Sequence, residues 1–386
     1  RRAEHGGSPG EIENWQAEIR QRERETNNLI LQAEAESKKS TSTPSDFDLP
    51  KLQKTLGAEN RILIEFTDFQ GELAVFVVAE DELGLIENLG TSENVQQILE
   101  QLHFQFGTLR YGAKALEKHL PELKRRTLRH LNDLYEMLVA PLEDRFGDKS
   151  LVIVPTGNLH YVPFHALYDG NQFVIEKRAV SYAPSAGVLQ FLLEKSKPEF
   201  EKILAVGFSD ERVPQVEREV LSLAETSVKT RVLTGAEATF AAVRESLKQN
   251  FDVLHLACHG QFRAENPLFS SLHLADGWAT VRDAAKLDLR NSLVVLSACE
   301  TGLRRIAAGD ELLGLVRGFL AAGANALVLT LWTVNDEATA RLMLEFYQNL
   351  QKKDSLATSL RKAQLKFIEQ DMHPYFWSPF VLVGRW

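Results

Sequence analysis

Two short apolar runs in the sequence lead to residues that could carry out nucleophilic catalysis. Residues 252–258 lead to His259, and residues 291–298 lead to Cys299. Both runs have the length of buried strands, and the carboxyl ends of parallel strands meet at one edge of a sheet, where ligands bind. A thiolate is a nucleophile, and a nearby imidazole can take the proton of the thiol and later protonate the leaving amine. The pattern therefore predicts a Cys–His dyad at that edge.

Small residues next to these two positions fit the same chemistry. The backbone N–H groups of Gly260 and Cys299 could hold the oxyanion of a tetrahedral intermediate. Ser297, Ala298 and Gly302 would let a substrate backbone approach the nucleophile. Taken alone, a cysteine at the end of a buried strand is often a small packed residue, and a histidine there is often a hydrogen-bonding group of the core. The dyad interpretation depends on both residues occurring at strand ends.

A metal site is the alternative for the first run, which contains His255, Cys258 and His259. Successive side chains of a strand point to opposite faces, so His255 would face away from Cys258. The sequence also contains no Cys-x-x-Cys pair, which a structural zinc site commonly uses. We therefore expect no metal ion, and we expect Cys258 to pack beneath the sheet.

Strands and helices are predicted to alternate from residue 151 onward. Continuous apolar strands between amphipathic helices indicate an α/β fold with a mostly parallel sheet that helices cover on both faces. The predicted strands are Leu151–Val154, Phe173–Ser181, Ile203–Gly207, Arg231–Leu233, Val253–Cys258, Ser271–Leu274, Leu293–Ala298, Ala326–Leu331 and Phe380–Val383. The predicted helices are Val216–Ala224, Thr239–Gln249, Asp310–Ala322, Asn335–Leu350 and Ser355–Ile368.

A smaller unit precedes this alternating pattern. Residues 61–86 are typical of three short strands, and residues 93–146 have helical spacing, which together make a βββαα unit. Residues 12–31 carry a narrow apolar stripe on an otherwise charged helix, and residues 37–50 are typical of a linker. We therefore predict three parts: a helical tail and linker at 1–44, an α+β unit at 45–147, and an α/β domain at 148–386 that contains His259 and Cys299.

The composition excludes several classes of protein. The 386 residues are 44% hydrophobic and 25% charged, which is typical of globular proteins and not of disordered or fibrous ones. No apolar run is long enough to span a membrane, and a net charge of −9 argues against binding nucleic acid. Two cysteines exclude a disulfide-stapled secreted domain and favour a reducing, cytoplasmic location. The chain begins with Arg1 and shows no signal peptide, so we expect it to be a piece of a longer protein.

Six ordered segments of the chain match one protein family. They are Leu151–Leu167, Ala183–Ala186, His255–Gly260, Leu296–Gly302, Gly309–Leu315 and Leu331–Asp336. These segments resemble the CHAT domain, a caspase-like cysteine protease domain of clan CD that is related to separase and often follows tetratricopeptide repeats. The resemblance covers residues 45–386 and implies a mostly parallel caspase-like sheet flanked by helices, preceded by a non-catalytic α+β half.

The resemblance also implies roles for individual residues. His259 and Cys299 match the catalytic dyad, and the backbone at Gly260 and Cys299 matches the oxyanion hole. Ser297 lies two residues before the nucleophile, where caspase-like enzymes line the pocket for the P1 residue. No cofactor and no metal ion are implied.

Trp332 and Asp336 are expected to form another wall of this pocket, and Asp336 leaves two interpretations open. A buried, unpaired carboxylate would favour Lys or Arg as the P1 residue of the substrate. A carboxylate that caps the helix beginning near Asn335 would leave an apolar or small-residue pocket. We favour the cap.

These features predict a cysteine endopeptidase that cuts a specific partner protein. An activating partner would act through helical repeats upstream of the chain, of which residues 12–31 would be the last remnant. Its binding would order the loop at 300–308, which has few large apolar anchors. The alternative is a non-enzymatic interaction or scaffold module with the same fold. Neither a membrane nor a nucleic acid is expected as a partner.

Overall fold

The computed structural model describes residues 47–110, 117–196, 200–209, 216–224, 229–261, 267–300, 310–332 and 336–386. The helical tail predicted for residues 1–44 and the loop at 301–308 lie outside these residues. Residues Phe47–Trp386 form one compact unit. None of the helices in the described ranges is both long and apolar enough to cross a membrane.

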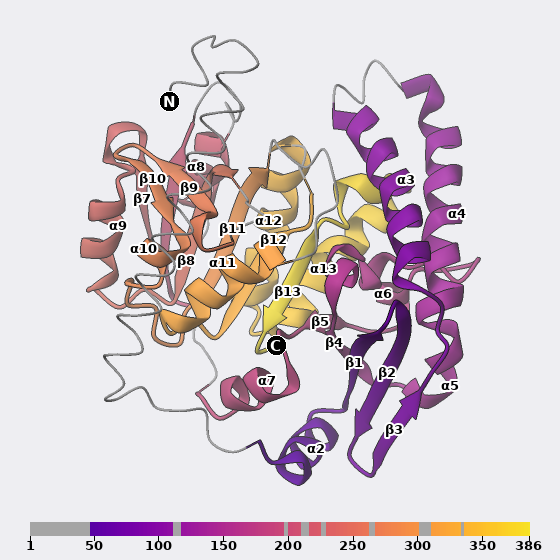
Figure 1. Cartoon of the computed structure of the whole chain (residues 1–386). Helices are drawn as coiled ribbons and strands as arrows, with labels where there is room; N and C mark the ends of the chain where they lie inside the picture. Colours follow the sequence, from indigo (N-terminus) through magenta and orange to yellow (C-terminus); the bar gives the residue numbers. More distant parts are fainter. Residues whose placement is uncertain are drawn as a thin grey trace, which may run out of the picture. The chain divides into compact units, whose positions relative to one another are not determined.

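Within the described residues, thirteen strands form a single sheet (Figure 1). The strands are β1 Arg61–Phe69, β2 Glu72–Ala79, β3 Glu82–Ile86, β4 Ser150–Val154, β5 Val180–Tyr182, β6 Lys202–Phe208, β7 Lys229–Thr234, β8 Val253–Gln261, β9 Ser271–Leu274, β10 Gly277–Thr280, β11 Leu293–Glu300, β12 Ala326–Thr330 and β13 Phe380–Gly384. Most of them carry continuous apolar side chains; all five residues of β12, for example, are buried. Such strands are stable only where both faces of the sheet are covered.

The strand order divides the sheet into two regions. Strands β7, β6, β8, β11 and β12 are parallel in that order, and β13 follows antiparallel to β12. The sheet then continues through β5, β4 and β1 in parallel, and ends in the antiparallel meander β1–β2–β3. The mostly parallel α/β fold predicted from the sequence is confirmed. Because β1 pairs with β4, backbone pairing crosses the predicted boundary at residue 147, and the division into two halves stays a prediction.

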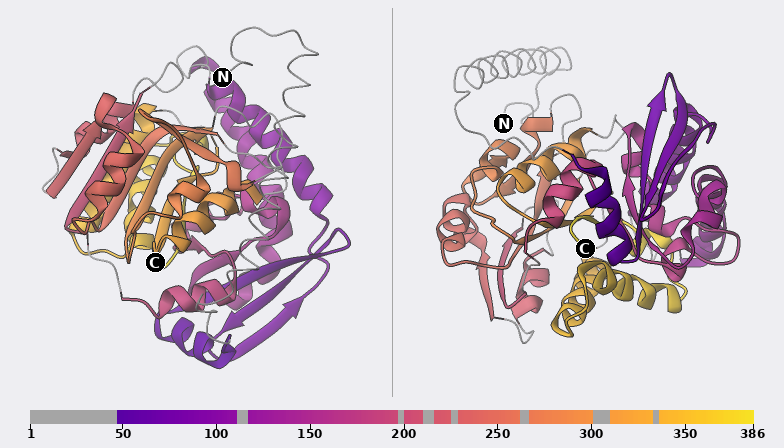
Figure 2. Two further views of the ribbon diagram at one scale, coloured as in Figure 1. Left: turned by 60° about the vertical axis from the view of Figure 1, so that its left-hand side comes forward. Right: turned by 90° about the horizontal axis from the view of Figure 1, so that it is seen from below.

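Helices cover both faces of the part of the sheet that contains β8 and β11 (Figures 1 and 2). His255 and Leu256 are successive residues of β8 and therefore point to opposite faces. His255 meets side chains of α8 and α12, whereas Leu256 packs with side chains of α9, α10 and α11. The helices are α2 Leu49–Ala58, α3 Ser92–Arg110, α4 Leu120–Leu138, α5 Glu143–Phe146, α6 Val174–Lys177, α7 Ala186–Leu193, α8 Val216–Ala224, α9 Phe240–Leu247, α10 Val281–Ala284, α11 Asp310–Ala321, α12 Asp336–Gln351 and α13 Leu356–Glu369.

The strand predicted at 173–181 is wrong in its first half, where the chain forms the short helix α6 before β5. Glu176 explains the helix, because its carboxylate accepts a hydrogen bond of 2.6 Å from the backbone N–H of Phe173. A carboxylate three residues after the helix N-cap satisfies a backbone donor that would otherwise lack an intrahelical partner. The apolar run at this point therefore turns instead of extending.

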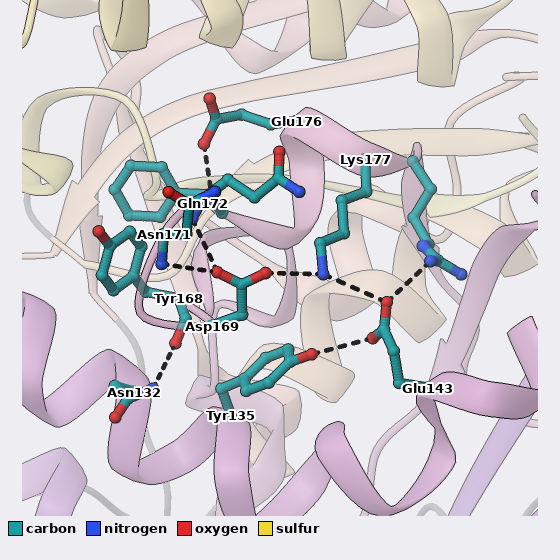
Figure 3. Close-up of polar contacts among 11 residues, drawn as sticks. Asn132, Tyr135, Glu143, Tyr168, Asp169, Asn171, Gln172, Glu176 and Lys177 are labelled. Atoms are coloured by element: carbon teal, nitrogen blue, oxygen red, sulfur yellow. Dashed lines mark hydrogen bonds and ion pairs between the residues drawn. The ribbon is translucent and has the colours of Figure 1, made fainter.

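Polar side chains hold the segment at 168–177 against helices α4 and α5 (Figure 3). The Asp169 carboxylate accepts hydrogen bonds of 2.7 and 2.8 Å from the backbone N–H groups two and three residues later. Lys177 forms ion pairs with Asp169 at 2.7 Å and with Glu143 at 3.3 Å. Burial, together with the charge of Glu143, raises the pKa of Tyr135 to about 12, so its hydroxyl remains a donor to that carboxylate. The segment that leads into β5 is thus tied to both helices.

Two glycines with similar backbone conformations give a test of how tightly β13 packs. Gly384 has φ of 101°, and a Cβ atom there would lie 2.6 Å from the carbonyl oxygen of Asn325. Gly71 has φ of 91°, but a Cβ atom there would meet nothing within 4 Å. An alanine at either position costs roughly 1–2 kcal/mol for the backbone conformation. We expect Gly384→Ala to cost roughly 1–3 kcal/mol more than Gly71→Ala, because only Gly384→Ala forces a clash.

Urea unfolding of the two variants, compared with the wild-type chain, measures this difference in the free energy of unfolding. Equal losses in the two variants would show that the contact between Gly384 and Asn325 relaxes without cost.

Candidate active site

The structure brings His259 and Cys299 together as direct neighbours in the sheet. Strands β8 and β11 are parallel, and their register pairs Cys299 with His259 and Glu300 with Gly260. For Cys299 the structure describes the backbone, whereas the His259 side chain is described and is only 2% exposed. Both positions lie at the carboxyl ends of their strands, as the sequence predicts. Their catalytic roles stay a prediction.

Strand β8 runs further than the predicted end at Cys258. Gly260 and Gln261 pair with Leu272 and Ser271 of β9, so the ladder continues past His259. Gly260 is therefore backbone-paired with β11 on one side and with β9 on the other. The oxyanion-hole role of the backbone at Gly260 and Cys299 stays a prediction.

An aromatic side chain that the sequence reasoning missed covers the imidazole of His259. The rings of His259 and Trp278 lie 5.6 Å apart between centroids, with an angle of 72° between their planes. Trp278 belongs to β10, which was not predicted. The signal was present in the sequence, because an Asp-Gly pair such as Asp276-Gly277 is typical of a tight hairpin turn.

A buried polar network lies behind the dyad positions, on the face of the sheet that carries His255. The carboxylate of Glu219, in α8, accepts a hydrogen bond of 2.9 Å from the Ser297 hydroxyl and lies 3.0 Å from Nε2 of His255. Nδ1 of His255 lies 3.0 Å from the hydroxyl of Tyr347 in α12. All four residues are at most 3% exposed. The sequence reasoning missed Glu219, whose position near the start of a helix is also typical of a surface acid.

The protons of this network can be assigned so that every donor has an acceptor. Burial, and next to it the charge of Glu219, raises the pKa of Tyr347 well above its ordinary value, so the phenol keeps its proton. Tyr347 then donates to Nδ1 of His255, and Nε2–H of His255 donates to Glu219. Glu219 thus receives one hydrogen bond from β8 and one from β11. The donor in β8, His255, lies four residues before His259, and the donor in β11, Ser297, lies two residues before Cys299. One carboxylate holds both strands directly behind the candidate dyad.

The three predicted pocket residues are found in different environments. Ser297 is 2% exposed, and its hydroxyl is used by Glu219. Trp332 is 6% exposed; its indole N–H donates a bond of 3.4 Å to the Tyr375 carbonyl, and its ring lies 4.7 Å from that of Phe106 in α3. Asp336 is the first residue of α12, and the residues before it lie outside the described ranges. Their pocket roles and the cap at Asp336 stay predictions.

Two other carboxylates near the site have structural partners. Asp276 accepts hydrogen bonds from the backbone N–H groups at the start of α9, at 2.9 and 3.4 Å. Asp283 forms a capping box with Thr280 at the start of α10. Asp276 thus lies in the turn between β9 and β10, and Asp283 lies in the first turn of α10. Among the described residues, no group of His, Cys, Asp or Glu side chains is arranged to hold a metal ion.

Removing the Glu219 carboxylate should strongly destabilise the fold, because it leaves two buried donors without an acceptor. We expect Glu219→Ala to lower the free energy of unfolding by roughly 3–5 kcal/mol, and Glu219→Gln by less, because an amide oxygen can still accept from His255. Glu217→Ala, in the same helix turn but only partly buried, is the control and should stay within about 0.5 kcal/mol of wild type. Chemical unfolding of the three variants measures this, and equal losses in Glu217→Ala and Glu219→Ala would contradict the network's role.

Comparisons with known proteins place the chain in a family. Residues 128–385 match the model of the CHAT domain. Tetratricopeptide repeat protein 28 from Mus musculus is 27% identical over 344 residues, which cover 71% of this chain and 14% of that protein. The human protein of the same name is 25% identical over 325 residues, which cover 66% of this chain and 13% of that protein. The chain therefore spans about one seventh of the length of these relatives.

Solved structures show the same fold at low sequence identity. Two crystal structures of the Saccharomyces cerevisiae separase–securin complex align with TM-scores of 0.61 and 0.59, at 11% and 12% identity. The two alignments cover 87% and 86% of this chain, and 30% and 31% of the matched separase-complex chains. The chain shares the caspase-like fold of separase, and it belongs to the CHAT domain family.

Proposed function

We propose that this chain is a cysteine endopeptidase in which Cys299 is the nucleophile and His259 is the general acid and base. The observation that carries the proposal is the register of β8 and β11, which pairs the two residues side by side at the carboxyl ends of parallel strands. Membership of the CHAT domain family and the separase-like fold support the same assignment.

The proposed reaction has two steps. His259 takes the proton of the Cys299 thiol, and the thiolate attacks the carbonyl carbon of the scissile peptide bond. The backbone N–H groups of Gly260 and Cys299 hold the negative charge on the carbonyl oxygen. The carbon–nitrogen bond then breaks as the imidazolium protonates the leaving amine, which leaves a thioester on Cys299. Water hydrolyses the thioester with His259 as the base, and the free thiol returns.

The proposed substrate is an extended segment of a partner protein, and no metal or cofactor takes part. The relatives are named for tetratricopeptide repeats, and we propose that such repeats, outside this chain, receive the activating partner. A chain with two cysteines, of which Cys258 is buried in the sheet, suits a reducing compartment such as the cytoplasm.

We expect Cys299→Ala and His259→Ala each to abolish peptide cleavage while the chain stays folded. The assay is digestion of a proteome-derived peptide library, with mass spectrometry of the new termini, and circular dichroism confirms the fold. A thiol-reactive peptide probe should label the wild-type chain and not Cys299→Ala. A folded wild-type chain that neither cleaves nor is labelled, even in the presence of the activating partner, would favour a non-enzymatic interaction module.

Cys258→Ala is the matched control, because Cys258 is adjacent to His259 in β8 but points to the opposite face of the sheet. It is 1% exposed, so its removal should cost about 1 kcal/mol of stability and leave cleavage largely intact. An inactive but folded Cys258→Ala, together with an active Cys299→Ala, would reverse the assignment of the nucleophile.

Metal chelators should not change the rate of cleavage, whereas iodoacetamide should inactivate the chain by alkylating Cys299. The rate of peptide cleavage after each treatment measures this. Loss of activity with a chelator, restored by added zinc, would overturn a mechanism that uses the thiolate and imidazole alone.

A further inference from the structure

Trp278 stands between the candidate catalytic histidine and solvent. Its side chain is 40% exposed, whereas His259, on which it packs, is 2% exposed. The proposed mechanism gives this tryptophan no role. A large apolar side chain that is exposed beside a catalytic group is a candidate contact for substrate.

The indole is held in place by the hairpin of β9 and β10. Strand β9 pairs with β8 at Gly260 and Gln261, directly after His259, and Trp278 pairs with His273 across the hairpin. The rings of Trp278 and His273 are stacked, with centroids 4.6 Å apart and planes 14° apart. Phe208, at the end of β6, packs edge-on against the ring of His273, with 5.1 Å between the ring centroids. The exposed indole is therefore a fixed surface.

The strand order places this surface on one side of the dyad. Along the sheet the strands run β11, β8, β9 and β10 (Figure 1). His259 in β8 therefore lies between Cys299 in β11 and Trp278 in β10. In acyl transfer the nucleophile attacks the carbonyl carbon, and the general acid protonates the amine that leaves. The peptide that follows the scissile bond must therefore pass the imidazole and continue beyond it, toward Trp278.

We propose that Trp278 forms the subsite for the first residue after the scissile bond, P1′, and that it favours an apolar side chain there. This inference deepens the proposed function and depends on it. When the carbon–nitrogen bond breaks and the amine takes its proton from the imidazolium, the new amino-terminal residue lies against the indole. An apolar side chain gains by covering the exposed ring, whereas a charged side chain would lose part of its hydration against the indole.

The test compares cleavage of paired peptides that differ only at P1′, with leucine in one and aspartate in the other. Their common sequence is taken from a peptide that the wild-type chain cleaves in a proteome-derived library. The wild-type chain should prefer leucine, and Trp278→Ala should lower the leucine-to-aspartate ratio of kcat/KM about tenfold, which is typical of losing one apolar contact at a substrate subsite. Trp278→Phe, which keeps an aromatic face, should retain most of the preference.

Phe69→Ala is the control, because Phe69 is an aromatic residue of β1 that is 73% exposed and outside the site. It should leave the ratio unchanged. If Trp278→Ala slows both peptides equally, Trp278 acts only by positioning His259, and the P1′ assignment is wrong. A wild-type chain that cleaves peptides without preferring leucine overturns this inference alone. A folded wild-type chain that cleaves nothing, even in the presence of the activating partner, overturns the proposed function, and the P1′ assignment with it.

Discussion

The parallel ladder between β8 and β11 is the constraint on which the candidate site depends. Eight successive residue pairs, from Leu293 with Val253 to Glu300 with Gly260, fix the two strands in one register. A shift by one residue would separate His259 from Cys299 and also turn one set of side chains to the opposite face. The apolar residues earlier in both strands thus determine which residues meet at the carboxyl edge of the sheet.

The buried carboxylate of Glu219 reinforces that register from outside the sheet. A carboxylate removed from water is unfavourable unless hydrogen bonds replace its hydration. Glu219 can be satisfied only when β8 and β11 keep the register in which Ser297 lies two residues beyond the partner of His255, because each of these side chains supplies one of its donors. Packing of α8 is therefore coupled to the alignment of β8 with β11. The apolar core alone would tolerate small displacements that this network does not.

The sequence was sufficient for the fold class and for placing His259 and Cys299 at the carboxyl ends of buried strands, because both follow from local patterns. That the two strands are direct neighbours follows from the strand order of the sheet. Continuous apolar runs ending in His259 and Cys299 specify buried parallel strands and place both residues at the same edge. The contacts of Glu219 and Trp278 could not be predicted in this way. Glu219 looks like an ordinary first-turn acid of α8, and Trp278 reaches His259 only because β9 pairs with the end of β8. Such contacts arise between segments that are distant in sequence.

The sheet is continuous across residue 147 because β1 pairs with β4. The parts of the chain before and after this residue are therefore unsuited to fold as separate proteins. Strand β4 is paired on one side with β5 and on the other with β1, and four of its five residues are buried. Without β1, β4 would become an open apolar edge, which is a template for pairing with other chains and for aggregation. The meander of β1–β3 therefore protects the apolar edge that β4 would otherwise expose, and it keeps the sheet that contains β8 and β11 from pairing with other chains.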